Sequence, residues 1–419
     1  NLVRVIGSEG YLVVPNPWLP GRDGSSSGIS VHRLQEDVQE ISVEPTPLYA
    51  AEADAVADHL VERQAPQMSW DDTLGTMATL DEWRRAIGLT YPAERLDASI
   101  PTVHGRPLAK RADNVMRYGE IAGVGKQVSR LVMGVDNQTT LPHATVMFDD
   151  FFERGGTTFD TAYIYGRGLC EKVLGQWIRN RDLRSDVVVI GKGAHTPHCD
   201  PESITRQLAE SLDRLQTDYL DVYFMHRDNP DIPVAEFVDV LDEHLRAGRI
   251  KAYGGSNWSL DRVAEANAYA ESAGKTPFAA VSNNFSLARA MDVPWAGCMS
   301  ASDDASRHWL EKNQLALMPW SSQARGFFSG RAAPENKSDA ELVRCWYSDD
   351  NFERLARATD LAQRRGVATT AIALAYVLHQ EFPTFPLIGP RALAETRSSF
   401  DALTIDLTPD EVRWLDLRD

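Results

Sequence analysis

The spacing of apolar positions changes at about residue 116. Beyond Met116, short runs of apolar and β-branched residues alternate with stretches in which apolar residues recur every three or four positions. The short runs predict eight strands, at residues 131–134, 157–160, 187–192, 221–225, 251–256, 279–282, 315–318 and 385–388. The stretches between them predict helices, for example at 201–215, 233–246, 260–273 and 369–380. Strands that lack a polar face and alternate with helices are typical of a parallel sheet buried on both faces.

Eight such units predict an α/β fold, a closed (β/α)8 or TIM barrel over residues 116–419. A doubly wound open sheet is the alternative, although that fold usually has fewer strands. Ahead of the first strand, residues 117–130 predict a hairpin that turns at residues 123–126.

The first 91 residues follow another pattern, which predicts an α+β segment. Residues 2–6, 10–14 and 29–33 predict strands, and a loop rich in Gly and Ser lies at 21–28. Residues 52–60 predict a helix. Ser69 can cap a second helix, and Gly88 suits the end of that helix. Residues 92–115 show no sustained period, so we interpret them as a linker between the two regions.

Composition narrows the possible partners. The 419 residues include 43 Lys and Arg against 60 Asp and Glu, which gives a net charge of −17. This acidic balance argues against nucleic acid or an anionic membrane as the main partner. No run of apolar residues is long enough to predict a membrane-spanning helix.

The cysteines and the start of the chain bear on its location and extent. Four well-separated cysteines without a CxxC pair predict free thiols in a reducing compartment, the cytoplasm. The chain starts without Met inside a predicted strand, and it lacks a signal peptide pattern. We therefore expect it to be a piece of a longer product.

Polar residues end several of the predicted barrel strands, which is where TIM barrels carry catalytic groups. Asp160 ends the second strand, Lys192 ends the third, and His226 follows the fourth. Because a buried charge needs a partner, Asp160 and Lys192 are expected to pair. The ammonium group would lower the pKa of Tyr165, in the loop after the second strand, so that this phenol exchanges a proton with a substrate oxygen. His226 would donate a hydrogen bond to the same oxygen.

The motifs around these residues resemble the aldo-keto reductase family. They are Phe-Asp-Thr-Ala-Tyr-Ile-Tyr-Gly at 159–166, Gly-Lys at 191–192, Phe-Met-His at 224–226, Gly-Gly-Ser-Asn at 254–257 and Leu-Ile-Gly-Pro-Arg at 387–391. The resemblance covers residues 116–419. It implies that Asp160, Tyr165, Lys192 and His226 form the catalytic tetrad of that family. It also implies a barrel that binds a nicotinamide cofactor without a Rossmann domain.

The resemblance implies a cofactor site as well. Ser256 and Asn257 would hold the carboxamide together with Ser282, which stands where the family often has Gln. Trp320 would stack on the nicotinamide ring. The loop that follows it would cross the pyrophosphate, and residues after the eighth strand would approach the adenosine phosphate; these are Ser322, Gln323, Arg325, Gly389, Arg391 and Arg397. The cofactor is NADP or NAD, and Arg391 favours NADP. Phe400 stands where the family has an Asn for adenine.

Residues 1–91 resemble the end of a Gfo/Idh/MocA-type oxidoreductase. The resemblance rests on Gly-Tyr-Leu-Val-Val-Pro-Asn-Pro-Trp at 10–18, Met-Ser-Trp-Asp-Asp-Thr-Leu at 68–74 and Leu-Asp-Glu-Trp-Arg at 80–84. Neither a GxGxxG motif nor that family's Lys-Pro catalytic motif occurs, so this region should have no catalysis of its own. The resemblance implies a fusion protein that forms a homo-oligomer through its N-terminal segment.

Two other motifs have competing interpretations. His195, His198, Cys199 and Asp200 suggest a metal site, but Pro197 breaks any helical face and further ligands are missing, which favours a substrate-side loop. Residues 123–126 resemble the tail of a P-loop but lack its upstream Gly and its Ser or Thr. Asp160 and Lys192 by themselves would also fit a structural ion pair.

The sequence therefore predicts an NAD(P)(H)-dependent oxidoreductase that interconverts a carbonyl group and an alcohol, with Tyr165 as acid and base. The substrate is expected to be a small aldehyde, ketone or sugar, and the N-terminal resemblance hints at sugar metabolism. Two alternatives stay open. The barrel could be catalytically idle and serve as a scaffold or oligomerisation module, or it could be one half of a two-site sugar oxidoreductase fusion.

Overall fold

The structure, a computed structural model, describes residues 2–21, 26–44, 47 and 49–418, and it divides into two compact units. Residues 1–90 form the first unit and residues 91–419 the second. Each unit is described by itself. Among the described residues, no helix has both the length and the apolar character needed to cross a membrane.

The first unit contains an antiparallel sheet and two helices. The sheet has the order β1 (Leu2–Gly7), β2 (Gly10–Pro15), β3 (Ser27–Arg33) and β4 (Gln39–Val43). The helices are α1 (Ala50–Asp58) and α2 (Trp70–Ala86), and neither has a buried residue. Strand β4 was not predicted; its residues are all exposed, and it is defined by pairing with β3. The predicted Gly- and Ser-rich loop lies partly outside the described residues.

Helix α2 begins as its sequence predicts. The Ser69 hydroxyl accepts a hydrogen bond from the Asp72 backbone N–H at 3.1 Å, and the Asp72 carboxylate accepts one from the Ser69 backbone N–H at 2.9 Å. This reciprocal arrangement satisfies two backbone donors that the first turn of a helix leaves free. Gly88 follows the helix with a positive φ of 67°, the conformation that glycine adopts with least strain.

The second unit contains all eight predicted barrel strands. They are β7 (Val132–Gly134), β8 (Thr158–Asp160), β9 (Val188–Gly193), β10 (Leu220–Met225), β11 (Ile250–Ser256), β12 (Ala280–Ser282), β13 (Ala316–Leu317) and β14 (Leu387–Ile388). Neighbouring strands are parallel in the order β13-β12-β11-β10-β9-β8-β7-β14.

The ends of this sheet meet. A parallel bridge joins Leu317 to Thr384, the Phe385 N–H donates to the Leu317 carbonyl at 2.8 Å, and the Leu387 N–H donates to the Pro319 carbonyl at 2.9 Å. The sheet therefore closes into a barrel, and the open-sheet alternative is wrong.

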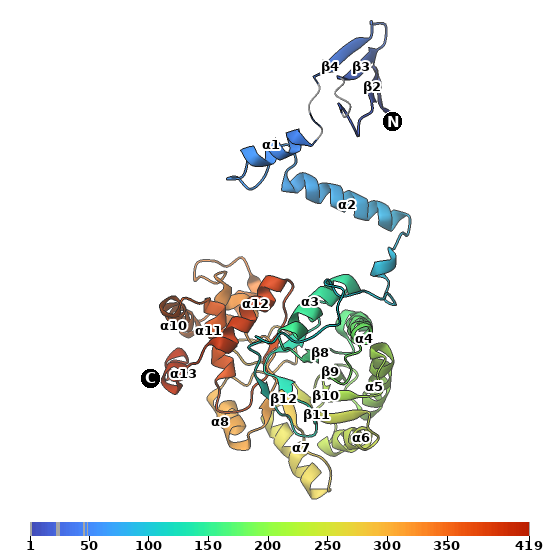
Figure 1. The fold of residues 1–419 in the computed structure, drawn as a ribbon. Helices are drawn as coiled ribbons and strands as arrows, with labels where there is room; N and C mark the ends of the chain where they lie inside the picture. The colour runs from blue at the N-terminus through green and yellow to red at the C-terminus, as the bar shows by residue number, and fades with distance from the viewer. Residues whose placement is uncertain (1, 22–25, 45–46, 48, 419) are drawn as a thin grey trace. The chain divides into compact units, whose positions relative to one another are not determined.

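Helices alternate with the strands, and Figure 1 shows α3 to α7 around β8 to β12. The four predicted helices appear as α5, α6, α7 and α11 with ends shifted by at most two residues. The α-helices of this unit are α3 (Leu141–Glu153), α4 (Leu169–Arg181), α5 (Pro201–Leu215), α6 (Val234–Arg246), α7 (Leu260–Ser272), α8 (Asp304–Asn313), α9 (Ala340–Trp346), α10 (Asp349–Arg365), α11 (Thr369–Leu378), α12 (Leu393–Asp401) and α13 (Pro409–Leu415). Short 3-10 helices are η1 (Pro92–Glu94), η2 (Tyr165–Gly168), η3 (Ala324–Ser329) and η4 (Ala402–Thr404).

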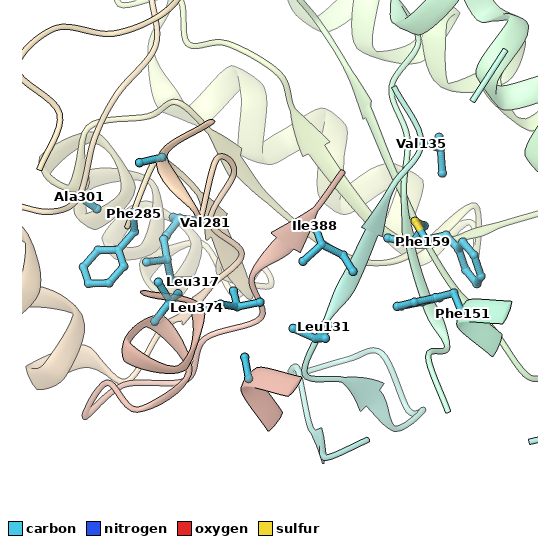
Figure 2. Close-up of a cluster of buried hydrophobic side chains, with 14 of the residues drawn as sticks. Leu131, Val135, Phe151, Phe159, Val281, Phe285, Ala301, Leu317, Leu374 and Ile388 are labelled. Atoms are coloured by element: carbon cyan, nitrogen blue, oxygen red, sulfur yellow. The ribbon is translucent and has the colours of Figure 1, made fainter. Parts of the chain in front are cut away.

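The main hydrophobic core lies between the barrel strands and the surrounding helices. Phe151 of α3 meets Phe159 of β8 edge to face with ring centroids 5.5 Å apart, and Figure 2 shows these two side chains together. Phe400 packs edge-on against Phe151 at 5.8 Å and is buried. It is therefore a core residue.

A second apolar cluster fills the barrel interior at one end. It contains Val132, Val188, Ile190, Val222, Phe224 and Ala252, with Ile121, Val124 and Val128 from the predicted hairpin. The hairpin strands are β5 (Tyr118–Gly119) and β6 (Val128–Ser129). Gly123 at its turn lies so close to the Lys251 carbonyl that an added Cβ would stand 2.8 Å from it. Lys251 lies near the start of β11, so the hairpin covers the N-terminal end of the barrel. A ligand can therefore enter the interior from the C-terminal end.

Residues 91–115, most of which we interpret as a linker, belong to the second unit and pack against its helices. Gln176 of α4 donates to the Ala98 carbonyl at 3.1 Å, Arg181 donates to the Ile100 carbonyl at 2.6 Å, and Arg111 forms an ion pair with Glu153 at 3.0 Å. The segment adopts little regular structure beyond η1. The domain limits 1–91, 92–115 and 116–419 stay predictions.

Candidate active site

The pleat of the barrel strands brings the candidate tetrad together. Side chains alternate between the two faces of a strand, so residues two apart share a face. On β9, Val188 and Ile190 belong to the interior cluster, and Lys192 continues the same face. On β10, Val222 and Phe224 do the same, and His226 follows at the next inward position. Apolar side chains therefore fill the N-terminal part of the barrel interior, and titratable side chains occupy its C-terminal mouth.

The four tetrad side chains lie together. Lys192 forms an ion pair with Asp160, with 2.5 Å between Nζ and Oδ1, and both side chains are 3% exposed. The Lys192 ammonium lies 5.5 Å from the centroid of the Tyr165 ring. The Tyr165 and His226 rings meet edge to face with centroids 5.7 Å apart. A phenol, an ammonium group and an imidazole thus face one small region.

The protonation of Tyr165 differs from the expectation. Burial raises the pKa of Tyr165 to about 12, although the Lys192 ammonium acts in the opposite direction. The expected influence of Lys192 is present, but desolvation of the phenolate is larger. The prediction of a net lowered pKa is therefore wrong in this structure, and Tyr165 is a protonated phenol at neutral pH.

His226 is held neutral. Burial lowers the pKa of His226 well below its ordinary value, and the nearby Lys192, Arg227 and His195 charges act in the same direction. For Lys192, burial on its own would lower the pKa, but attraction to the Asp160 carboxylate raises it above the ordinary value. The site therefore offers a neutral imidazole and an ammonium group at neutral pH.

Four of the predicted cofactor residues gather beside the tetrad. Asn257 Nδ2 donates to Ser256 Oγ at 3.1 Å, and Ser256 Oγ donates to the Ser282 carbonyl at 3.0 Å. The Trp320 indole N–H donates to Asn257 Oδ1 at 3.2 Å. The buried Ser282 hydroxyl has no partner among the described residues. An amide group with donors and acceptors on one edge, such as a nicotinamide carboxamide, would use such an unpaired hydroxyl, so these residues fit the group.

The other predicted cofactor residues line the loops after β13 and β14. Ser322 Oγ donates to the Leu387 carbonyl at 2.7 Å, and Gln323 Nε2 contacts the Thr370 carbonyl at 3.4 Å. Arg325 pairs with Glu341, with 2.5 Å between Nε and Oε1, so its charge is already compensated. This pairing weakens Arg325 as a candidate for the pyrophosphate.

Gly389, Arg391 and Arg397 are more available to a ligand than Arg325, whose charge is already paired. A Cβ added at Gly389 would meet only Asn137 and Asp136 atoms, both 4.0 Å away, which leaves open space at the backbone. Arg391 and Arg397 are exposed, and neither forms an ion pair within the described part of the chain. Open backbone with free guanidinium groups is suited to a phosphate.

The segment from His195 to Asp200 gives no support for a metal site. His195 Nδ1 lies 3.0 Å from the Thr196 carbonyl, and Cys199 Sγ contacts the Ala194 carbonyl at 3.1 Å. Asp200 caps α5 by accepting from Ser203. In the described residues, no three His, Cys, Asp or Glu side chains are placed to share a metal ion. The His195 ring instead meets His226 edge-on at 5.0 Å. All four cysteines are free and buried, as predicted.

Sequence reasoning missed the residues that cover the barrel mouth. Met299 N–H donates to Asn257 Oδ1 at 3.1 Å, Trp295 packs at a tilt against Trp320 at 5.9 Å, and Cys298 contacts Arg227. These residues lie in a loop between β12 and α8 that carries no motif. Arg227 could have been noticed, since it directly follows His226 at a strand end.

The chain is similar to several known proteins. The sequence model of the aldo/keto reductase family matches residues 131–417. The chain is 30% identical over 341 residues to a putative aryl-alcohol dehydrogenase, AAD14, of Saccharomyces cerevisiae, which covers 75% of this chain and 87% of that protein. It is 28% identical over 322 residues to an uncharacterized oxidoreductase, YrpG, of Bacillus subtilis, covering 72% and 95% of the two chains.

Two further matches are a fungal reductase and a solved structure. Norsolorinic acid reductase A of Aspergillus parasiticus is 29% identical over 307 residues, with 68% of this chain and 73% of that protein covered. A crystal structure of the thermostable aldo-keto reductase Tm1743 with the inhibitor epalrestat has a TM-score of 0.58 at 22% identity, over 73% of this chain and all of the other. That likeness supports the barrel fold alone. The resemblance of residues 1–91 to a Gfo/Idh/MocA-type protein stays a prediction.

Proposed function

Because this chain belongs to the aldo/keto reductase family, an oxidoreductase family, we propose that it reduces the carbonyl group of a small aldehyde or ketone with NADP(H) or NAD(H). One observation carries the proposal. The Lys192 ammonium pairs with the Asp160 carboxylate and lies 5.5 Å from the Tyr165 ring centroid, beside a neutral His226. A structural ion pair would not need the phenol and the imidazole at the same mouth.

The chemistry follows from the protonation states. When bound, the nicotinamide supplies the hydride that adds to the carbonyl carbon. Negative charge then develops on the carbonyl oxygen, and the Tyr165 hydroxyl donates its proton to that oxygen. Lys192 stabilises the phenolate that results, and Asp160 keeps Lys192 charged and in place. The neutral His226 donates a hydrogen bond that orients the carbonyl oxygen.

The raised pKa of Tyr165 fixes the form in which its hydroxyl enters the reaction. A phenol that is protonated at neutral pH can donate its proton during reduction, whereas alcohol oxidation starts from the phenolate.

The surroundings of the site favour an aromatic substrate over a sugar. Two relatives are named as aryl-alcohol dehydrogenase and norsolorinic acid reductase. In this chain, Trp295 and Trp320 stand together, and Asn257 links the Trp320 indole to the His226 carbonyl. Aromatic surfaces of this kind contribute stacking contacts of about 0.5–1.5 kcal/mol each to a flat ring.

A direct test is a fluorescence titration of the protein with NADPH and NADH, followed by a panel of aryl and sugar aldehydes. Trp320 lies next to the proposed nicotinamide position, so binding should quench tryptophan emission. We expect saturable binding of at least one reduced dinucleotide and its oxidation when an aryl aldehyde is added. A protein that binds neither dinucleotide would contradict the proposal and favour the scaffold alternative.

Asn257→Ala tests the carboxamide position. The substitution removes an amide that contacts Ser256, Met299 and Trp320. Because an unmade hydrogen bond in a buried site costs about 1–3 kcal/mol, the Kd for the dinucleotide should rise about tenfold or more. Asn267→Ala is the matched control, since Asn267 also accepts a buried backbone hydrogen bond, from Phe278, but lies on α7. Equal Kd values for the two variants would place the nicotinamide elsewhere.

The pKa of Tyr165 predicts opposite pH profiles for the two directions. Reduction uses the protonated phenol, so it should be present at full strength below the pKa and be lost as pH rises toward about 12. Oxidation uses the phenolate, so it should rise about tenfold per pH unit over the same range. Measurement of kcat/KM in both directions between pH ~6 and ~10 checks this. A reduction rate that falls steeply through neutrality would show that another group donates the proton.

A further inference from the structure

Arg227 is a buried cation that directly follows His226. Its side chain is 6% exposed. Nη1 donates to the His226 carbonyl at 2.8 Å, and Nη2 donates to Cys298 Sγ at 3.2 Å. Nε has no partner in the part of the chain that the structure describes. A carbonyl and a thiol are neutral acceptors, and sulfur is a weak one. Burial of a guanidinium group is unfavourable unless an anion compensates it.

Other buried arginines of the barrel unit have such an anion. Arg307 is 2% exposed and pairs with Asp416 at 2.9 Å, and the nearby Arg354 lies 3.8 Å from the same carboxylate. Arg227 has no carboxylate oxygen within 4.0 Å in the described part of the chain. Its neighbour in sequence, Asp228, is held by Arg262 through two hydrogen bonds of 3.0 and 3.2 Å. The positive charge of Arg227 is therefore uncompensated.

Arg227 lies at the catalytic mouth. Its backbone N–H donates to the Ala194 carbonyl, next to His195, and its side chain shares the His226 carbonyl with Asn257 Nδ2. Cys298, which accepts a hydrogen bond from Arg227 Nη2, belongs to the loop that covers the mouth. The proximity of its charge also helps to lower the pKa of both His226 and, after the effect of burial, His195. The uncompensated charge thus lies beside His226 and close to His195, two residues of the mouth.

We propose that Arg227 binds a carboxylate group of the substrate, so that the preferred substrates are aldehydes or ketones that carry a carboxylate away from the reacting carbon. This inference rests on the proposed carbonyl reductase activity. The planar guanidinium group matches a carboxylate through two parallel hydrogen bonds, and the free Nε together with the weakly held Nη2 provides that pair of donors.

The charge balance distinguishes a carboxylate from a phosphate. Lys192 is already paired with Asp160, and His195 and His226 are held neutral by burial. One unit of positive charge then remains, from Arg227. A carboxylate carries one negative charge, whereas a phosphate monoester carries about two at neutral pH and would need a second cation.

Matched substrates and variants test this assignment. The substrates are 4-carboxybenzaldehyde and its neutral methyl ester, which differ at a single charge. The full chain is compared with Arg227→Met and Arg227→Lys. The control is Arg364→Met on α10, which removes the same charge from an exposed side chain. Thermal unfolding establishes that each variant is folded, and Arg227→Lys provides a second route if the Met variant is not.

We expect the unmodified chain to reduce the acid at least about tenfold more efficiently than the ester, in kcat/KM. Arg227→Met should lose about 10–100-fold for the acid, chiefly through KM, and less than about threefold for the ester. Arg227→Lys should retain part of the preference, because it keeps the charge but not the paired donors. Equal losses for acid and ester would overturn the proposal, since Arg227 would then only position His226 and the covering loop.

A binding measurement separates this inference from the activity. Calorimetric titration of the protein with 4-(hydroxymethyl)benzoate needs no turnover. If neither aldehyde is reduced but the benzoate binds and Arg227→Met weakens it about tenfold, the carboxylate site stands and the proposed function falls. If both aldehydes are reduced and the benzoate binds equally well to the unmodified chain and to Arg227→Met, the function stands and the carboxylate site falls.

Discussion

Replacement of Tyr165 by Phe is expected to lower kcat for carbonyl reduction about 10²–10⁴-fold, the usual contribution of a positioned general acid. The substitution removes one oxygen atom, that of the hydroxyl whose pKa the Lys192 ammonium acts to lower. The ring, with its edge-to-face contact to His226, is retained. Binding of the dinucleotide should therefore be unchanged, and the loss should lie in kcat. Stopped-flow measurement of hydride transfer under single-turnover conditions checks this.

Tyr163→Phe is the matched control, because it removes a phenol hydroxyl two residues away. The Tyr163 hydroxyl donates to Glu210 at 2.8 Å, away from Lys192. We expect kcat to change less than about threefold in this variant, since this partly buried hydrogen bond contributes to stability and touches no reacting group. Full carbonyl reductase activity in Tyr165→Phe would refute the assignment of Tyr165 as proton donor and move attention to His226.

Lys192→Met is expected to abolish reduction and to lower the free energy of unfolding by about 3–5 kcal/mol. The variant leaves the Asp160 carboxylate buried without its partner, and removal of one member of a buried ion pair is costly for this reason. Activity is lost because the phenolate formed at Tyr165 has no cation to stabilise it. Urea unfolding followed by circular dichroism measures the stability change, and NADPH oxidation measures the activity.

Two companion variants separate these effects. Lys275→Met removes the partner of Asp239, an ion pair at the surface, and should change stability by no more than about 1 kcal/mol. Addition of Asp160→Asn to Lys192→Met removes the unpaired charge, so stability should largely recover while activity stays lost. A Lys192→Met protein as stable as the unmodified chain would mean that Asp160 and Lys192 are not a buried pair in solution.

The positions of the tetrad were predictable because the barrel repeats one pattern. Each strand alternates between its two faces, and the apolar residues at inward positions, such as Val188 and Ile190 or Val222 and Phe224, set the direction of Lys192 and His226. The Asp160–Lys192 pair then follows from the adjacency of β8 and β9. Strand β4 was missed for the complementary reason: none of its residues is buried, so no hydrophobic pattern marks it.

The sequence by itself determined the eight strands, the hairpin that closes one end of the barrel, and the order in which polar groups reach the other end. These properties depend on local spacing and chain order, which can be read directly from the sequence. The tertiary structure alone decided that Tyr165 is a protonated phenol, because desolvation of its ring depends on elements far apart in the chain. It likewise decided that Arg227 is buried without a counter-charge, since Cys298, in a loop without any motif, lies over it while Asp228 pairs with Arg262. Burial and charge balance are sums over distant neighbours, and a linear pattern does not contain them.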